Sequence, residues 1–292
     1  MVRRRALRLL AVAAAGLVLA SCSLTRLVFS NVTIAYNNAT PVIAWMVDDY
    51  VDLTEPQKDW VRDRLSRTIA WHREQELPEY RRFFEKLSAQ VEDNISVEEA
   101  RAAHRELRGH YRRLLEHMLP DMAELLLQLD AEQIAQVERK FSVENRKIVK
   151  ESVDGTPEKR SARRARRYFE QLEEWTGRLN ASQRELIASR LKTMPEHVEE
   201  RLAERGYRQA GIVALARSRP AREQAIAELR RLVIETESWR RPEYQQKVRE
   251  RDEQLFEMIS ALSQTLSANQ RARLQGRLRG FMRDITELTA SS

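Results

Sequence analysis

The chain has 292 residues, enough for a sizeable core or for two helical subdomains, and its single cysteine excludes a disulfide within one chain. One third of the residues are charged, whereas glycine and proline number only eight each, a composition typical of long, solvent-exposed helices. The formal net charge is +7, but four arginines lie among the first eight residues, so 7 − 4 = +3 remains for the rest, which argues against nucleic acid as a partner.

The first 21 residues have the features of a secretory signal peptide. The four arginines precede an apolar run, Leu9–Leu19, which is too short to span a bilayer as a helix. Small residues then lead to Cys22, where a processing peptidase would need access. We therefore expect cleavage between Ser21 and Cys22.

The segment Leu19-Ala20-Ser21-Cys22 resembles the lipobox of bacterial lipoproteins, in which the cysteine is acylated after the leader is removed. The resemblance implies a protein that contacts the membrane through a lipid anchor on Cys22. Ser23 stands where an aspartate would favour retention at the inner membrane. We therefore expect anchoring to the outer membrane, at its periplasmic face.

Residues 22–52 form the expected lipid-anchored N-terminal segment. No charged residue occurs between Leu27 and Val47, so this stretch either packs on the helical core or lies at the membrane interface. Three aspartates follow, Asp48, Asp49 and Asp52. They form either an acidic surface beside the arginines of the next helix or a site for a cation or for acid–base chemistry.

Prolines and turn residues divide the remaining chain into amphipathic segments. The predicted helices are, in chain order, 55–77, 79–93, 97–119, 121–128, 131–153, 157–177, 181–206, 219–238, 241–264 and 268–289. Asp154-Gly155-Thr156-Pro157 is the best internal turn, so we expect subdomains at 53–153 and 154–292. No run of alternating β-branched residues occurs. The prediction is an all-α protein, an elongated or arched array of long helices without a sheet.

A five-residue motif that begins with leucine and ends with glutamine occurs four times. The copies are Leu53-Thr54-Glu55-Pro56-Gln57, Leu129-Asp130-Ala131-Glu132-Gln133, Leu179-Asn180-Ala181-Ser182-Gln183 and Leu266-Ser267-Ala268-Asn269-Gln270. Ile95-Ser96-Val97-Glu98-Glu99 is a degenerate fifth copy. A hydroxyl or Asx residue followed three places later by Gln or Glu is a capping box, which predicts a helix start at each copy.

Glutamine rather than glutamate ends four of the five copies, which capping alone does not explain. The pattern resembles the L-T-x-x-Q motif of the small periplasmic chaperones Spy and CpxP. That resemblance implies an all-helical protein that binds unfolded or envelope proteins on a concave surface.

The N-terminal half also resembles an uncharacterised family of Gram-negative lipoproteins. The residues that carry this resemblance are Tyr36-Asn37-Asn38-Ala39, Trp45, Asp48-Asp49-Tyr50-Val51-Asp52-Leu53-Thr54 and Glu76-Leu77-Pro78-Glu79-Tyr80. The family implies a fold and a location, but no known activity.

Motifs for catalysis are nearly absent. The sequence has no G-x-S-x-G, no glycine-rich phosphate loop and no H-E-x-x-H. His104, His110 and His117 fall in one predicted helix, but none has a glutamate three residues before it, as a helical metal site would need. We expect these histidines to be solvated or capping, and we expect no enzyme, no metal and no cofactor.

A run of six cations within nine residues contains no acid. It comprises Lys159, Arg160, Arg163, Arg164, Arg166 and Arg167. The run is either a solvated face neutralised by nearby glutamates or a patch for a polyanion.

The expected function is binding, by an anchored helical adaptor or chaperone-like protein. The alternative is an envelope scaffold that holds anionic lipid or glycan through the basic run. A hydrolase or metal-dependent enzyme using Asp48, Asp49 and Asp52 comes third.

Overall fold

The computed structural model describes residues 32–290, and these residues fold entirely into helices and their connections, which confirms the all-α prediction. The predicted signal peptide, residues 1–21, and Cys22 lie outside the described residues. The helices are α4 (Val32–Asn37), α5 (Ala39–Val51), α6 (Glu55–Trp71), η1 (His72–Glu76), α7 (Leu77–Gln90), α8 (Val97–Gln128), α9 (Ala131–Ser152), α10 (Pro157–Thr176), α11 (Ala181–Thr193), α12 (Val198–Ser218), α13 (Arg222–Val233), η2 (Thr236–Ser238), α14 (Pro242–Gln264) and α15 (Ala268–Ala290).

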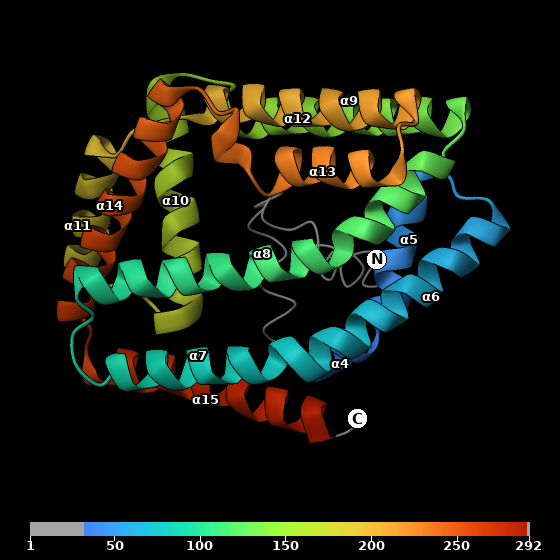
Figure 1. Ribbon diagram of the computed structural model, residues 1–292. Coiled ribbons are helices and arrows are strands. Elements are labelled where there is room, and N and C mark those ends of the chain that lie inside the picture. The colour runs from blue at the N-terminus through green and yellow to red at the C-terminus, as the bar shows by residue number, and fades with distance from the viewer. Residues whose placement is uncertain (1–31, 291–292) are drawn as a thin grey trace, which may run out of the picture.

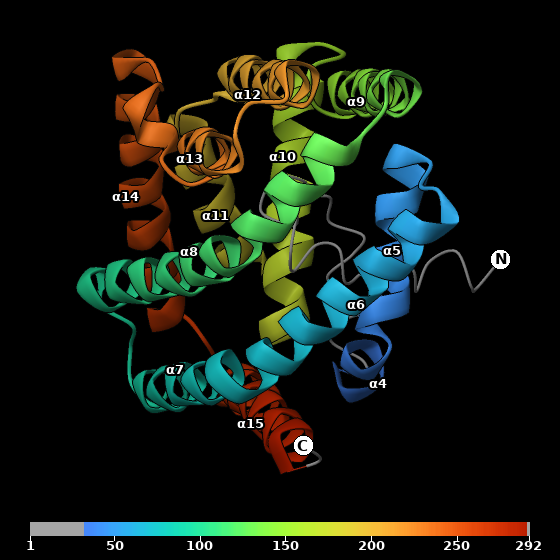
Figure 2. The same cartoon turned by 45° about the vertical axis from the view of Figure 1, so that its right-hand side comes forward.

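The helices form an open frame with α8 crossing it (Figure 1). Helices α9, α12 and α13 run along one side, α10, α11 and α14 along the next, and α7 and α15 along the side opposite α9. Figure 2 shows the same frame from a second direction, with α5 and α6 beside α4 on the remaining side. Helices distant in sequence therefore pack together, as α7 does along α15 and α8 against α13 and α14.

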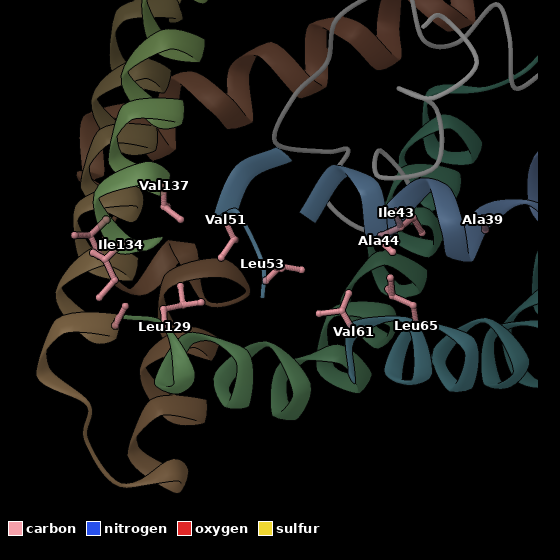
Figure 3. Packing of buried hydrophobic residues seen from close by; sticks show 12 residues of the cluster. Ala39, Ile43, Ala44, Val51, Leu53, Val61, Leu65, Leu129, Ile134 and Val137 are labelled. Atoms are coloured by element: carbon pink, nitrogen blue, oxygen red, sulfur yellow. The ribbon is translucent and has the colours of Figure 1, made fainter. Parts of the chain in front are cut away.

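The buried core is divided among the sides of this frame. Where α5, α6 and α9 meet, Ile43 and Ala44 lie beside Leu65, and Val51 lies near Val137 (Figure 3). Separate clusters join α10, α11 and α14, join α8, α12 and α13, and join α4, α7 and α15. Each element therefore buries its apolar stripe locally, as expected for amphipathic helices.

Two prolines that were expected to end helices do not end them. Pro78 was expected to separate helices 55–77 and 79–93, but α6, the π-helical turn η1 and α7 run on without a break. The wider π turn ends at Glu76, two residues before Pro78, and Leu77 N donates to His72 O at its end. That arrangement accommodates a residue with no N–H and a ring that would clash in an ordinary turn.

Pro120 likewise lies inside α8, which was expected to be two helices, 97–119 and 121–128. Leu119 and Ala123 on either side are fully buried against α13. This packing holds the helix together across the hydrogen bond that proline cannot make.

The predicted helix 181–206 is two helices, α11 and α12, separated by residues 194–197. Pro195 restricts the residue before it to extended backbone, and Met194 accordingly has φ −70° and ψ 126°. Downstream, the predicted helix 219–238 begins only at Arg222, because Arg219 ends α12 in the left-handed region with φ 44°, and it is interrupted between α13 and the 3₁₀ turn η2.

Candidate functional site

All five motif copies lie at helix starts. Thr54, Ser96, Asp130, Asn180 and Ser267 each directly precede the first residue of a helix. In the last four copies the cap side chain accepts from the amide of the third helical residue, and that residue's side chain accepts from the amide of the cap. At Thr54, its backbone N donates to Gln57 Oε1 over 3.0 Å. The motif is therefore a helix cap in every copy.

The four glutamines also meet in two pairs, which the sequence did not predict. Gln183 and Gln270, 87 positions apart, exchange reciprocal amide hydrogen bonds of 2.9 and 3.0 Å. Each also donates to the backbone before the partner motif, Gln183 to Thr265 O and Gln270 to Arg178 O, both over 3.0 Å. Each amide therefore caps its own helix through oxygen and ties a distant helix start through nitrogen.

Gln57 and Gln133 form the second pair, with Nε2–Oε1 distances of 3.3 and 2.6 Å. Gln133 donates to Asp52 O over 3.1 Å, which repeats the geometry of the first pair. Gln133, Gln183 and Gln270 are buried, whereas Gln57 is half-buried. The glutamines of the motif therefore bind one another rather than presenting their amides at the surface.

The three aspartates do not form a common site. Asp48 Oδ1 accepts from Leu53 N over 2.9 Å, and its other oxygen lies 3.6 Å from Lys58 Nζ. Asp49 pairs with Lys140 over 2.7 Å. Asp52 ends α5 in the left-handed region, with φ 62°. Each aspartate thus stabilises a helix end or a helix contact, and no group of three or more metal-binding side chains occurs among the described residues.

The basic run is dispersed around α10 rather than gathered into one patch. Arg163 donates to Asp154 O, Arg160 lies 3.8 Å from Glu196, and Arg166 pairs with Glu170 over 2.9 Å. Arg164 donates to Met194 O over 3.0 Å at the end of α11. Lys159 is exposed, whereas Arg167 is half-buried and lies close to Arg201 of α12.

Arg167 belongs to a second arginine group that sequence reasoning missed. Arg201, Arg205 and Arg208 are spaced by four and three residues, so they share one face of α12. Neighbouring cations come from α10 (Arg167), from the segment after η2 (Arg240) and from α14 (Arg251). The spacing of these three arginines could have revealed the group from sequence. The predicted helix boundary at residue 206, however, separated Arg208 from Arg201 and Arg205.

A buried polar cluster surrounds the π turn. His72 lies with Nδ1 3.0 Å from the Tyr36 hydroxyl and Nε2 3.3 Å from the Tyr80 hydroxyl. Burial lowers the pKa of His72 to about 4, against a partial opposing effect of Glu76, and raises the pKa of Tyr80 to about 12. The imidazole is therefore held neutral between two tyrosines.

Glu76, the last residue of the π turn, carries the negative charge of this cluster. Its carboxylate accepts from Arg113 over 2.7 and 3.1 Å and lies 3.2 Å from His110 Nδ1. Burial alone would raise the pKa of Glu76, but hydrogen bonds from Arg113 and His110 outweigh it and lower the pKa. The expectation of a solvated or capping His110 was wrong, because this residue is 3% exposed and packs inside the cluster.

A groove of about 1170 Å³ lies between α9 and α12. Its apolar lining consists of Phe141, Val149, Ala210, Val213 and Ala214. At its polar edge, Asn145 donates to Gln209 over 2.7 Å. The remaining lining residues include a paired rim, in which Arg217 lies 2.7 Å from Glu138, and two exposed cations, Arg146 and Lys150.

These features define an all-α protein with paired helix caps, a cationic helix face and an apolar groove. The chain belongs to the family of unknown function DUF6279, whose match covers residues 49–245. The matched part contains the Gln57–Gln133 pair, the groove and the α12 arginines. Comparison with curated proteins and with solved structures found no match.

A negative charge introduced into the buried Gln183–Gln270 pair should destabilise the protein. Gln183→Glu would place a carboxylate against Thr265 O and Gln270 Oε1, both acceptors, and should cost about 3 kcal/mol of unfolding free energy. Gln57→Glu is the matched control: it keeps the cap and the short bond from Gln133, so it should cost less than about 1 kcal/mol. Urea unfolding of both variants measures the difference, and equal losses would contradict the pairing.

His72 predicts acid sensitivity. Because its pKa is lowered from 6.5 to about 4, the unfolded chain binds a proton before the folded chain does as pH falls. Stability should therefore be fully present above pH 6.5 and decrease by about 3 kcal/mol on reaching pH 4. Urea midpoints across this range should fall less steeply in His72→Gln. An unchanged pH slope in that variant would show that His72 is not the titrating group.

Proposed function

We propose that this protein is an outer-membrane lipoprotein that binds other envelope proteins at its periplasmic face. The leader and the resemblance of residues 19–22 to a lipobox support the anchor on Cys22. None of the described helices is long and apolar enough to cross a membrane. On this proposal, the lipid carries the protein and the helical frame carries the binding surface.

The groove between α9 and α12 is the observation that carries the binding role. At about 1170 Å³ it exceeds the usual volume of a small-molecule pocket, about 300–1000 Å³. Residues 206–218 of its α12 wall extend over about 18 Å, the length of an extended segment of five or six residues. The proposed occupant is an apolar polypeptide segment of a client protein.

The charges at the groove favour an acidic flank on that segment. Glu138 and Arg217 neutralise each other, and Asp154 offsets one of the two cations Arg146 and Lys150. The net charge of the lining is therefore 3 − 2 = +1. A client segment with an acidic residue beside its apolar part matches this distribution.

The chaperone-like form of the proposal rests on the groove and on the resemblance to Spy and CpxP, rather than on exposed glutamines. The paired amides already use their hydrogen bonds within the protein. The structure gives less support to the scaffold alternative, because the cations of α10 bind different partners and do not form one basic surface. No observation favours the aspartate-based enzyme, because each aspartate has its own structural contact.

Substitutions that fill the groove should reduce client binding. Ala210 and Ala214 are exposed positions of its α12 wall, so Ala210→Glu with Ala214→Glu should block the groove and leave the fold intact. Suppression of aggregation of a denatured client, followed by light scattering, should fall at least fivefold. Ala102→Glu, at an exposed position of α8, is the matched control and should behave as the parent. Equal suppression by all variants would rule out the groove.

The anchor predicts a processing defect. Cys22→Ser removes the only thiol, so the precursor should stay uncut by lipoprotein signal peptidase and should incorporate no radiolabelled palmitate. Membrane fractions of cells expressing each form provide the measurement. Equal labelling of variant and parent would exclude lipidation at Cys22.

A further inference from the structure

The arginine face of α12 passes from solvent into the protein. Arg201 is exposed, the side chain of Arg208 is 15% exposed, and Arg205 is buried with its Nε donating to Asn145 Oδ1 over 2.7 Å. Seven residues of helix separate Arg201 from Arg208, a rise of about 10 Å. Arg201 and Arg208 therefore lie at the two ends of one helix face, and the buried Arg205 between them is held against α9.

Other elements bring further cations to this face. Packing around Arg201 lowers its pKa, and Arg167 of α10 and Arg251 of α14 lower it further. Packing also lowers the pKa of Arg208, with a further contribution from Arg240. Guanidiniums remain charged at neutral pH, so these effects express a cost of holding the charges together rather than a loss of charge.

Among the described residues, the carboxylates near this face are fewer than these cations. The carboxylate nearest to Arg208 is Glu204, at 3.9 Å. Glu204 already accepts hydrogen bonds of 2.6 and 3.0 Å from Arg240. Asp252 pairs with Arg251, and Glu144 acts on Arg205. The six cations are Arg167, Arg201, Arg205, Arg208, Arg240 and Arg251. Glu237 also acts on Arg240, and against these four acids the six cations leave 6 − 4 = +2.

We propose that this face is a binding site for a ligand that carries two or more phosphate groups. Guanidinium groups bind phosphate through paired N–H donors, and partly desolvated ones bind it more strongly than those in bulk water. Arg201 and Arg208 would hold separate phosphates of one ligand, about 10 Å apart along the helix. The hydroxyls of Tyr111 and Tyr244, which lie near Arg208, supply further donors.

The depth of the site distinguishes a free ligand from a membrane surface. Arg208 is mostly covered, with helices α8 and α14 contributing neighbours, so a flat bilayer would reach Arg201 but not Arg208. The ligand is therefore a separate phosphorylated molecule. Arg201 and Arg208 are not among the residues that line the groove, whereas Arg205 bonds Asn145 at its polar edge, so the test of this site uses Arg201 and Arg208 alone.

Short-chain polyphosphate is a suitable probe, with inorganic phosphate and vesicles containing phosphatidylglycerol as comparison ligands. The full-length protein in neutral detergent should bind polyphosphate by calorimetry, with weaker binding of inorganic phosphate. Vesicle binding should not change in Arg208→Gln. In Arg201→Gln and Arg208→Gln, polyphosphate affinity should fall at least tenfold.

Arg166→Gln is the matched control, because it removes the same charge from an exposed residue of α10. Its affinity should stay within twofold of the parent. Without ligand, Arg208→Gln should keep or raise the melting temperature, since Glu204 retains Arg240. Equal loss of affinity in all three variants, or binding to vesicles but not to polyphosphate, would overturn the proposal. A lower melting temperature in Arg208→Gln without ligand would also overturn the proposal, because it would show that this arginine stabilises the fold.

Discussion

The frame depends on the reciprocal glutamine hydrogen bonds that join helix starts. A buried amide can accept from its own cap and donate to a partner at the same time, which a carboxylate cannot do. Gln183 and Gln270 thereby connect α11 to α15, and Gln57 and Gln133 connect α6 to α9. Backbone groups at helix starts would otherwise lose their partners on burial. The same bonds thus cap four helices and fix which helices meet.

Sequence reasoning predicted the caps but not their pairing, and physics explains both outcomes. A capping box is local, so a hydroxyl or Asx residue and a glutamine three places on suffice to place a helix start. The partners Gln57 and Gln133 are 76 positions apart, and only tertiary packing brings them together. Pro78 and Pro120 were misjudged for the same reason, because a π turn and buried neighbours override a local breaker.

The candidate sites show the same difference between what local sequence predicts and what tertiary packing decides. A run of cations in sequence does not make a patch, because successive residues of α10 point to different sides and meet different partners. A cationic face does arise where residues four and three apart share a side, as Arg201, Arg205 and Arg208 do. Burial then makes the charges of Arg205 and Arg208 costly, which supports the proposal of an anion site on this face.

Helix α12 carries both proposed surfaces, and its start decides where they lie. The break at residues 194–197 frees α12 from the direction of α11, so α12 meets α9 at the groove while Arg201 lies near Arg167 of α10 and Arg251 of α14. A helix continuing through residue 206 would have kept the arginines on the axis of α11. Pro195 thus shapes both proposed surfaces, because the backbone restriction that it imposes separates the capped helix α11 from α12, which carries them.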